Sequence, residues 1–199
     1  RPISVCHYED GQLTIIYKVV GKGTRAMSLM EKGKKLDILC GLGNGFDIAK
    51  AKGRRAAVIG GGVGVPPMYD TARRLIAQGN EVTAILGFAT ADAAFYIDQF
   101  MALGAKVLVT TDDGSFGMKG FVTDALAQAD CDYYFACGPQ PMLKGLHRTG
   151  LDGQLSFEER MGCGFGACMG CTCHTLVGDK RICADGPVFL SSEVTFDGK

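Results

Sequence analysis

The 199-residue sequence lacks the features that mark a membrane protein, a secreted protein or a nucleic-acid binder. No run approaches the ~18 apolar residues that a membrane-spanning helix requires, and no segment resembles a signal peptide. The 21 acidic residues balance the 21 basic residues, so the chain has no excess charge with which to attract nucleic acid or a membrane surface. We therefore expect a cytoplasmic protein with neither kind of partner.

Groups suited to acid–base catalysis are also scarce. The sequence has only three histidines, His7, His147 and His174, and they are dispersed along the chain. Asp112 and Asp113 in "TTDDGSFGMKG" are adjacent carboxylates, but Asp and Gly together are sufficient to form a turn. We expect a turn there, and we predict no catalytic residue in this chain.

Three units follow from the hydrophobic pattern. Residues 1–50 are rich in predicted strands, one over 12–20 and another over 34–40, with Thr24 expected to cap a short helix between them. In residues 51–150 short apolar strands alternate with amphipathic helices, which predicts a parallel sheet with helices on its faces. Residues 151–199 form a small cysteine-rich unit. The predicted fold class is α/β.

Cysteine is abundant, and its distribution argues against a disulfide framework. The total of nine is odd, and Cys6, Cys40, Cys131 and Cys137 lie singly in apolar or strand-like surroundings. The other five fall within residues 159–189. In a chain without secretory features, clustered cysteines indicate metal or redox chemistry rather than disulfides.

Four of the clustered cysteines have the spacing C-x4-C-x2-C-x11-C, which is typical of plant-type [2Fe–2S] proteins. A structural zinc site more often combines two closely spaced pairs of ligands, and this segment has only one C-x-x-C pair. His174 could serve as a further zinc ligand. We favour the [2Fe–2S] cluster. Its predicted ligands are Cys163, Cys168, Cys171 and Cys183.

Glycines between these cysteines support that choice. Gly162, Gly164, Gly166 and Gly170 let the backbone wrap closely and aim N–H groups at bridging sulfides, which a lone zinc ion does not have. Cys173 is the one clustered cysteine that is not assigned as a ligand. We expect it to be a small buried residue beside the site rather than a ligand.

Two further stretches point to a nucleotide. "VIGGGVGVPPM" places a glycine turn between a predicted strand and a helix, and "FACGPQPM" ends a later strand, where ligands gather in open α/β sheets. The turn departs from G-x-G-x-x-G at Val65, and a glycine turn can serve only to tighten a connection. Because no Arg or Lys follows the second strand, NADH is favoured over NADPH. The candidate NAD-binding residues are Gly60, Gly61, Gly62, Gly64, Cys137, Gly138 and Pro139.

Together these stretches resemble the NAD(P)-binding module of the ferredoxin reductase family, and "RPIS", "IYK" and "GKGT" resemble its flavin-binding barrel. The resemblance implies a partial N-terminal β-barrel, a central parallel-sheet module and a C-terminal [2Fe–2S] segment. A complete barrel needs more residues than precede Arg54, so we expect further strands before Arg1. The residues that the resemblance implies for FAD are Arg1, Pro2, Ile3, Ser4, Ile16, Tyr17, Lys18, Gly23 and Thr24.

The complete order of motifs, including "GNGFD", "ERMGCGFGACMGC" and "CADGPVF", resembles the electron-transfer subunits of NAD-dependent dihydroorotate dehydrogenases. This implies an FMN-containing catalytic partner, a heterotetramer with two of each chain, and electron transfer from FMN through [2Fe–2S] and FAD to NAD+ in pyrimidine biosynthesis. One alternative is the small subunit of a ferredoxin-dependent transhydrogenase or a sulfhydrogenase. The other is a non-catalytic binding or redox-sensing protein whose metal only stabilises the C-terminal segment.

Overall fold

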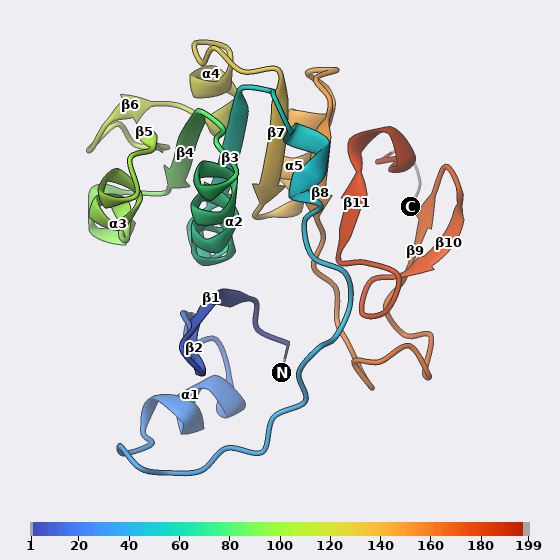
Figure 1. Cartoon of the computed structure of the whole chain (residues 1–199). Helices are drawn as coiled ribbons and strands as arrows, with labels where there is room; N and C mark the ends of the chain where they lie inside the picture. The colour runs from blue at the N-terminus through green and yellow to red at the C-terminus, as the bar shows by residue number, and fades with distance from the viewer. Residues whose placement is uncertain (1, 197–199) are drawn as a thin grey trace.

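The structure is a computed structural model that describes residues 2–196, so the predicted flavin contact Arg1 lies outside the described residues. Its centre is a seven-stranded sheet with the order β11-β8-β7-β3-β4-β5-β6 (Figure 1). Neighbouring strands run parallel except for β11, which pairs antiparallel with β8. The strands are β3 (Ala56–Gly61), β4 (Val82–Phe88), β5 (Lys106–Thr111), β6 (Met118–Lys119), β7 (Tyr133–Cys137), β8 (Gly153–Ser156) and β11 (Val188–Leu190).

Two hydrophobic cores cover the two faces of this sheet, as predicted for strands that alternate with helices. Along β3, Ala56 and Val58 point to one core and Ala57 and Ile59 to the other. The first core includes α2 (Val65–Ala77) and α3 (Ile97–Ala102). The second includes α4 (Val122–Leu126), α5 (Gln140–His147) and buried residues of the cysteine-rich unit, so that unit shares a core with the central module.

The N-terminal unit is smaller and more irregular than predicted. It contains the antiparallel hairpin β1 (Val5–Glu9) and β2 (Gln12–Ile15), followed by α1 (Lys22–Ser28). The predicted strand over 12–20 is wrong beyond Ile15, and the predicted strand over 34–40 is wrong throughout, because both segments are irregular. β-branched residues favour a strand only where a neighbouring strand completes the ladder, and within residues 2–196 β2 pairs only with β1.

The hairpin rests on α2 through a small aromatic cluster. Cys6 is fully buried and shares a side-chain hydrogen bond with Tyr96, whose backbone is left-handed at φ 68°. The ring of His7 meets Tyr69 edge-on, with ring centroids 5.7 Å apart. These contacts fix the hairpin on the central module, below α2 in Figure 1.

The remaining elements join the units. From α1 the chain runs as an irregular linker alongside the cysteine-rich unit to the short helix η1 (Ile48–Ala51) near β8 (Figure 1). The cysteine-rich unit contains the hairpin β9 (Thr172–Thr175) and β10 (Gly178–Arg181), then β11 and the short helix η4 (Ser191–Glu193). None of the helices within residues 2–196 has the length and apolar character needed to cross a membrane.

Candidate functional site

The predicted nucleotide site lies where the strand order of the sheet reverses. From β3 the chain builds outward through β4 and β5, and then returns to place β7 and β8 on the other side of β3. β3 and β7 are parallel neighbours, so the loops that follow them meet at one edge of the sheet. Ligands of open α/β sheets bind in the crevice at such a reversal, and both predicted NAD motifs lie there.

Contact between the two loops depends on glycine. A Cβ added to Gly64 would collide with the backbone carbonyl of Cys137, and one added to Gly61 would lie 2.6 Å from Sδ of Met142. A Cβ on Gly62 would meet no atom within 4 Å, and its φ of 52° favours glycine. The glycine turn therefore tightens the connection at Gly61 and Gly64 and leaves open space at Gly62.

The start of α2 limits where a phosphate could be held. Pro66 and Pro67 occupy its first turn and have no N–H, while the N–H of Val65 donates to the carbonyl oxygen of Gly62. Any backbone donors for a phosphate must therefore come from residues 62–64 rather than from the helix itself. A phosphate bound here would contact the backbone of the glycine turn, and that contact stays a prediction.

Cys137 ends β7 at the same edge. Burial raises the pKa of its thiol to about 11, against a weaker opposing effect of a side-chain hydrogen bond with Ser156. At neutral pH Cys137 is a protonated thiol, so it can pack against a ligand but is not an activated nucleophile.

The four predicted cluster ligands form two pairs. Side-chain interactions that shift the pKa values of Cys163 and Cys183 link Cys163 with Cys168 and Cys183 with Cys171. The sulfur of Cys163 also accepts the N–H groups of Ala167 at 3.2 Å and Cys168 at 3.4 Å. The sulfur of Cys171 accepts the N–H of Cys183 at 3.4 Å.

Backbone hydrogen bonds prepare Cys163 for metal binding. Donation from Cys168 and Phe165 lowers the pKa of Cys163 to about 6, so its thiolate predominates at neutral pH. Cys183 is buried, and burial together with its interaction with Cys171 raises its pKa. A thiolate is the form that binds metal, and a bound metal would deprotonate Cys183 as well.

This arrangement fits a two-iron cluster better than a single ion. In a [2Fe–2S] cluster with four cysteines each iron takes two thiolates, and the structure brings the thiols together two by two. His174 lies on the exposed β hairpin, where its Nδ1 pairs with Asp179 at 2.8 Å.

The glycines beside and between the cysteines have the positive φ values or close contacts that a tightly folded loop requires. Gly164 and Gly166 have φ of 82° and 90°, and a Cβ on Gly162 would lie 3.1 Å from the sulfur of Cys168. Cys173, the spare thiol, is half-buried on β9, and burial raises its pKa. It packs against the core, and its expected absence from the cluster ligands stays a prediction.

Two contacts near the cysteines were not predicted from the sequence. The guanidinium of Arg181 binds Asp185 and the carbonyl oxygen of Gly166, and its hydrogen bonds hold the pKa of Asp185 well below its usual range. Asn44, from the linker, binds the backbone just after Cys183. Asp185 belongs to the motif "CADGPVF" and Asn44 to "GNGFD", but these motifs do not show which residues their members contact.

The predicted FAD residues that the structure describes fall just before β1, on the chain after β2 and on α1, and Thr24 does not have its expected role. Ile16, Tyr17 and Lys18 follow β2 as irregular chain, and Tyr17 lines an open cavity of about 310 Å³ with Met27 and Met30. Pro2, Ile3 and Ser4 lead into β1. The predicted flavin contacts of these residues stay predictions.

We expected Thr24 to cap α1, but it is the third residue of that helix. Its hydroxyl donates to the carbonyl oxygen of Gly21 and accepts the N–H groups of Val20 and Gly21, which fixes the start of the helix. The hydroxyl is therefore occupied within the chain. The backbone N–H groups of Gly23 and Thr24 have no acceptor within the helix, so they fit a phosphate better than the side chain does.

The acidic pair in "TTDDGS" forms a turn. The carboxylate of Asp113 accepts the N–H of Ser115 at 3.0 Å and its hydroxyl at 2.6 Å, and these bonds lower its pKa. Ser115 in turn accepts the N–H of Ala91. Asp113 is thereby engaged in holding two loops together, as the turn hypothesis predicts.

The fold and the two sites define an oxidoreductase of the ferredoxin reductase-like class with an iron–sulfur segment at its carboxyl end. The family described as oxidoreductase NAD-binding domain matches residues 58–148. The family described as iron–sulfur cluster binding domain of dihydroorotate dehydrogenase B matches residues 158–195, which include all four predicted ligands.

Curated relatives agree over nearly the full chain. A dihydroorotate dehydrogenase B (NAD(+)) electron transfer subunit of Geobacillus thermodenitrificans is 46% identical over 204 residues, which cover 98% of this chain and 79% of the relative. The same subunit of Fusobacterium nucleatum is 43% identical over 209 residues, covering 99% and 80%. The chain belongs to the family of dihydroorotate dehydrogenase B electron transfer subunits.

Solved structures confirm the predicted fold class. A structure of an NADH-dependent reduced ferredoxin-NADP oxidoreductase, described in connection with flavin-based electron bifurcation, is similar with a TM-score of 0.88 and 33% identity. The match covers 99% of this chain and 74% of that one. The cytochrome b5 reductase domain of Ulva prolifera nitrate reductase, 20% identical with a TM-score of 0.56, shares the fold over 80% of this chain and 74% of that one.

Proposed function

We propose that this chain carries electrons from a dihydroorotate-oxidising subunit to NAD+. The pairing of the four cysteines is the observation that carries the proposal: the N–H of Cys168 donates to the sulfur of Cys163, and the N–H of Cys183 donates to the sulfur of Cys171, each at 3.4 Å. When bound, an iron–sulfur cluster carries single electrons, and a flavin exchanges them for the hydride that NAD+ accepts. The partner that this implies is an FMN-containing catalytic subunit.

Each unit of the chain has a separate task in this proposal. Residues 1–50 contribute to an FAD site, residues 51–150 bind NAD, and residues 151–199 hold the [2Fe–2S] cluster. β8 and β11 fall within the third unit yet extend the sheet of the second, so the cluster and NAD units are rigidly connected. Such a connection supports a fixed distance between bound redox groups.

The residues of this chain bind and orient the groups rather than catalyse a reaction on the pyrimidine. The backbone at Gly62–Gly64 approaches the dinucleotide, and Cys137, Gly138 and Pro139 border it on the β7 side. The four thiolates take the irons. An assembly of two chains of each kind and a cytoplasmic location are part of the proposal.

The test is reconstitution of this chain with an FMN-containing dihydroorotate-oxidising subunit, after loading with iron, sulfide and FAD. We expect orotate formation with NAD+ only when both chains are present. A preparation that is colourless, or that contains zinc without sulfide, would contradict the electron-carrier role and favour a metal-stapled binding protein.

A ferredoxin-dependent transhydrogenase subunit is the second candidate, and the similarity to the ferredoxin-NADP oxidoreductase structure favours it. The identity of 33% to that chain is lower than the 46% to the curated electron transfer subunit. Turnover with reduced ferredoxin, combined with inactivity toward dihydroorotate in the presence of the catalytic subunit, would make this second function the correct one.

A further inference from the structure

Arg181 makes an unusually complete set of contacts at the turn that carries Cys183. Its backbone N–H and its Nε both donate to Oδ2 of Asp185, at 2.8 and 2.9 Å, and its Nη2 donates to Oδ1 at 3.0 Å. Its Nη1 donates to the carbonyl oxygen of Gly166 at 3.0 Å. Both side chains are about two-thirds buried, with exposed fractions of 35% and 32%.

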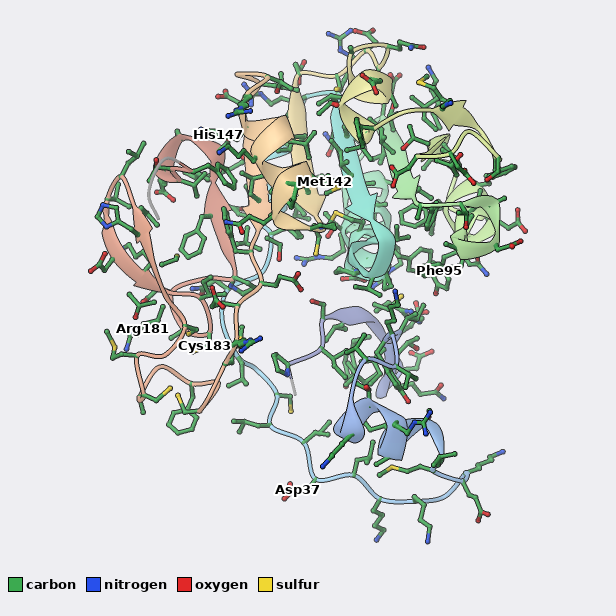
Figure 2. The ribbon with its side chains drawn as sticks, turned by 180° about the vertical axis from the view of Figure 1, so that it is seen from behind. Asp37, Phe95, Met142, His147, Arg181 and Cys183 are labelled. Carbon is green, nitrogen blue, oxygen red and sulfur yellow. The ribbon has the colours of Figure 1, made fainter. Side chains whose placement is uncertain are left out.

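These contacts join the two halves of the cysteine site. Gly166 lies in the loop between Cys163 and Cys168, whereas Arg181 and Asp185 flank Cys183. A Cβ on Gly166 would lie 3.0 Å from Nη1 of Arg181, so glycine permits the close approach. Figure 2 labels Arg181, at the end of β10, and Cys183, in the turn that follows it.

We propose that Arg181 and Asp185 are positioning residues that hold the two halves of the cysteine site together and set its reduction potential through their opposite charges. The inference rests on the proposed function, because it requires the cluster to be bound. It assigns no ligand role to either residue.

The physical basis is electrostatic. Uptake of one electron adds one negative charge to the site, so a nearby positive charge favours the reduced state and a negative charge opposes it. In the native pair the two charges largely cancel. Removing one charge leaves the other uncompensated in a partly buried position, where solvent screens it less than at the open surface.

The two variants should shift the midpoint potential in opposite directions, and this distinguishes an effect of charge on the potential from a purely structural role. Arg181→Gln leaves the Asp185 carboxylate alone and lowers the midpoint potential, whereas Asp185→Asn leaves the guanidinium alone and raises it. Each shift corresponds to about a tenfold change in the one-electron reduction equilibrium, which is about 59 mV. A role limited to holding the loops would shift both variants in the same direction, since both break the same ion pair.

The experiment is a redox titration of the reconstituted holoprotein, followed by its paramagnetic signal and visible absorption. Lys180→Gln is the matched control, because it removes a positive charge from the same strand, and we expect a smaller shift. The double variant Arg181→Gln/Asp185→Asn should return close to the potential of the unchanged protein.

Shifts of the two single variants in the same direction, or no shift in either, would overturn the inference. Should Arg181→Gln fail to keep the cluster, Asp185→Asn decides by itself, and a lowered or unchanged potential would refute the proposal. Absence of a cluster signal in the unchanged protein would instead contradict the proposed function.

Discussion

The side-chain amide of Asn44 donates a hydrogen bond to the carbonyl oxygen of Asp185 at 3.2 Å, although the two residues lie 141 positions apart. The same amide donates to the carbonyl oxygen of Ala184, and the backbone N–H of Asn44 donates to Gly186. Gly43 must be glycine here, because its φ is 65° and a Cβ would lie 2.5 Å from the carbonyl oxygen of Gly186. The linker from the N-terminal unit is thus fastened to the turn that carries Cys183.

Replacement of Asn44 by Asp should loosen that turn. Carboxylate oxygens would face two carbonyl oxygens and could donate nothing, so we expect the turn to lose about 1 kcal/mol of stabilisation. The measurement is the urea concentration at which the visible absorption of the cluster is half lost, which should fall. Lys35→Ala, in the same exposed linker, is the control. Equal midpoints for the two variants would show that Asn44 does not secure the Cys183 turn.

The assignment of ligands can be checked by removing single thiols. Cys183→Ser should lose most of the visible absorption, because Cys183 is a predicted ligand that lies beside Cys171, with its N–H 3.4 Å from the Cys171 sulfur. Cys173→Ser should keep most of it, because Cys173 is half-buried on β9 and packs against the core. The reverse result would show that the chain uses Cys173 as its fourth ligand.

The pH dependence of thiol alkylation should distinguish Cys163 from Cys137 in the metal-free protein. Cys163 has a pKa lowered to about 6, so its reactive thiolate persists at neutral pH and is lost as the pH falls through about 6. Cys137 has a pKa raised to about 11 by burial, so its thiolate forms only as the pH rises toward that value. Peptide mass spectrometry after brief iodoacetamide treatment measures both rates. Equal rates at pH 7 would contradict this electrostatic difference.

The central module could be predicted because local patterns determine most of it. Alternating strands and helices indicate a parallel sheet, and the glycine turn and the Cys-Gly-Pro stretch each follow a strand, so both had to lie at the carboxyl edge. The sequence did not show that β3 and β7 are neighbours, because strand order depends on packing between distant segments.

The N-terminal unit was harder to predict, because local patterns do not determine where its strands end. The composition of residues 12–20 favours a strand, yet the strand ends at Ile15, because pairing and not composition decides where a strand stops. The contacts of Asn44 and Arg181 were hidden for a similar reason. Each joins the Cys183 turn to a part of the chain whose proximity only the fold reveals.

The contact between the two predicted NAD loops gives a direct test of why glycine is needed at residue 64. In Gly64→Ala the added methyl group would collide with the backbone carbonyl of Cys137, which cannot move as a flexible side chain could. We expect the free energy of unfolding to fall by about 1–3 kcal/mol and NADH binding to weaken, because the loops after β3 and β7 would be forced apart. Gly45→Ala is the matched control, since a Cβ there meets no atom within 4 Å. Urea unfolding and NADH titration of the two variants measure both effects. If Gly64→Ala matched Gly45→Ala in both, the two loops would not form a shared NAD site, because a site built on their close approach must respond when that approach is blocked.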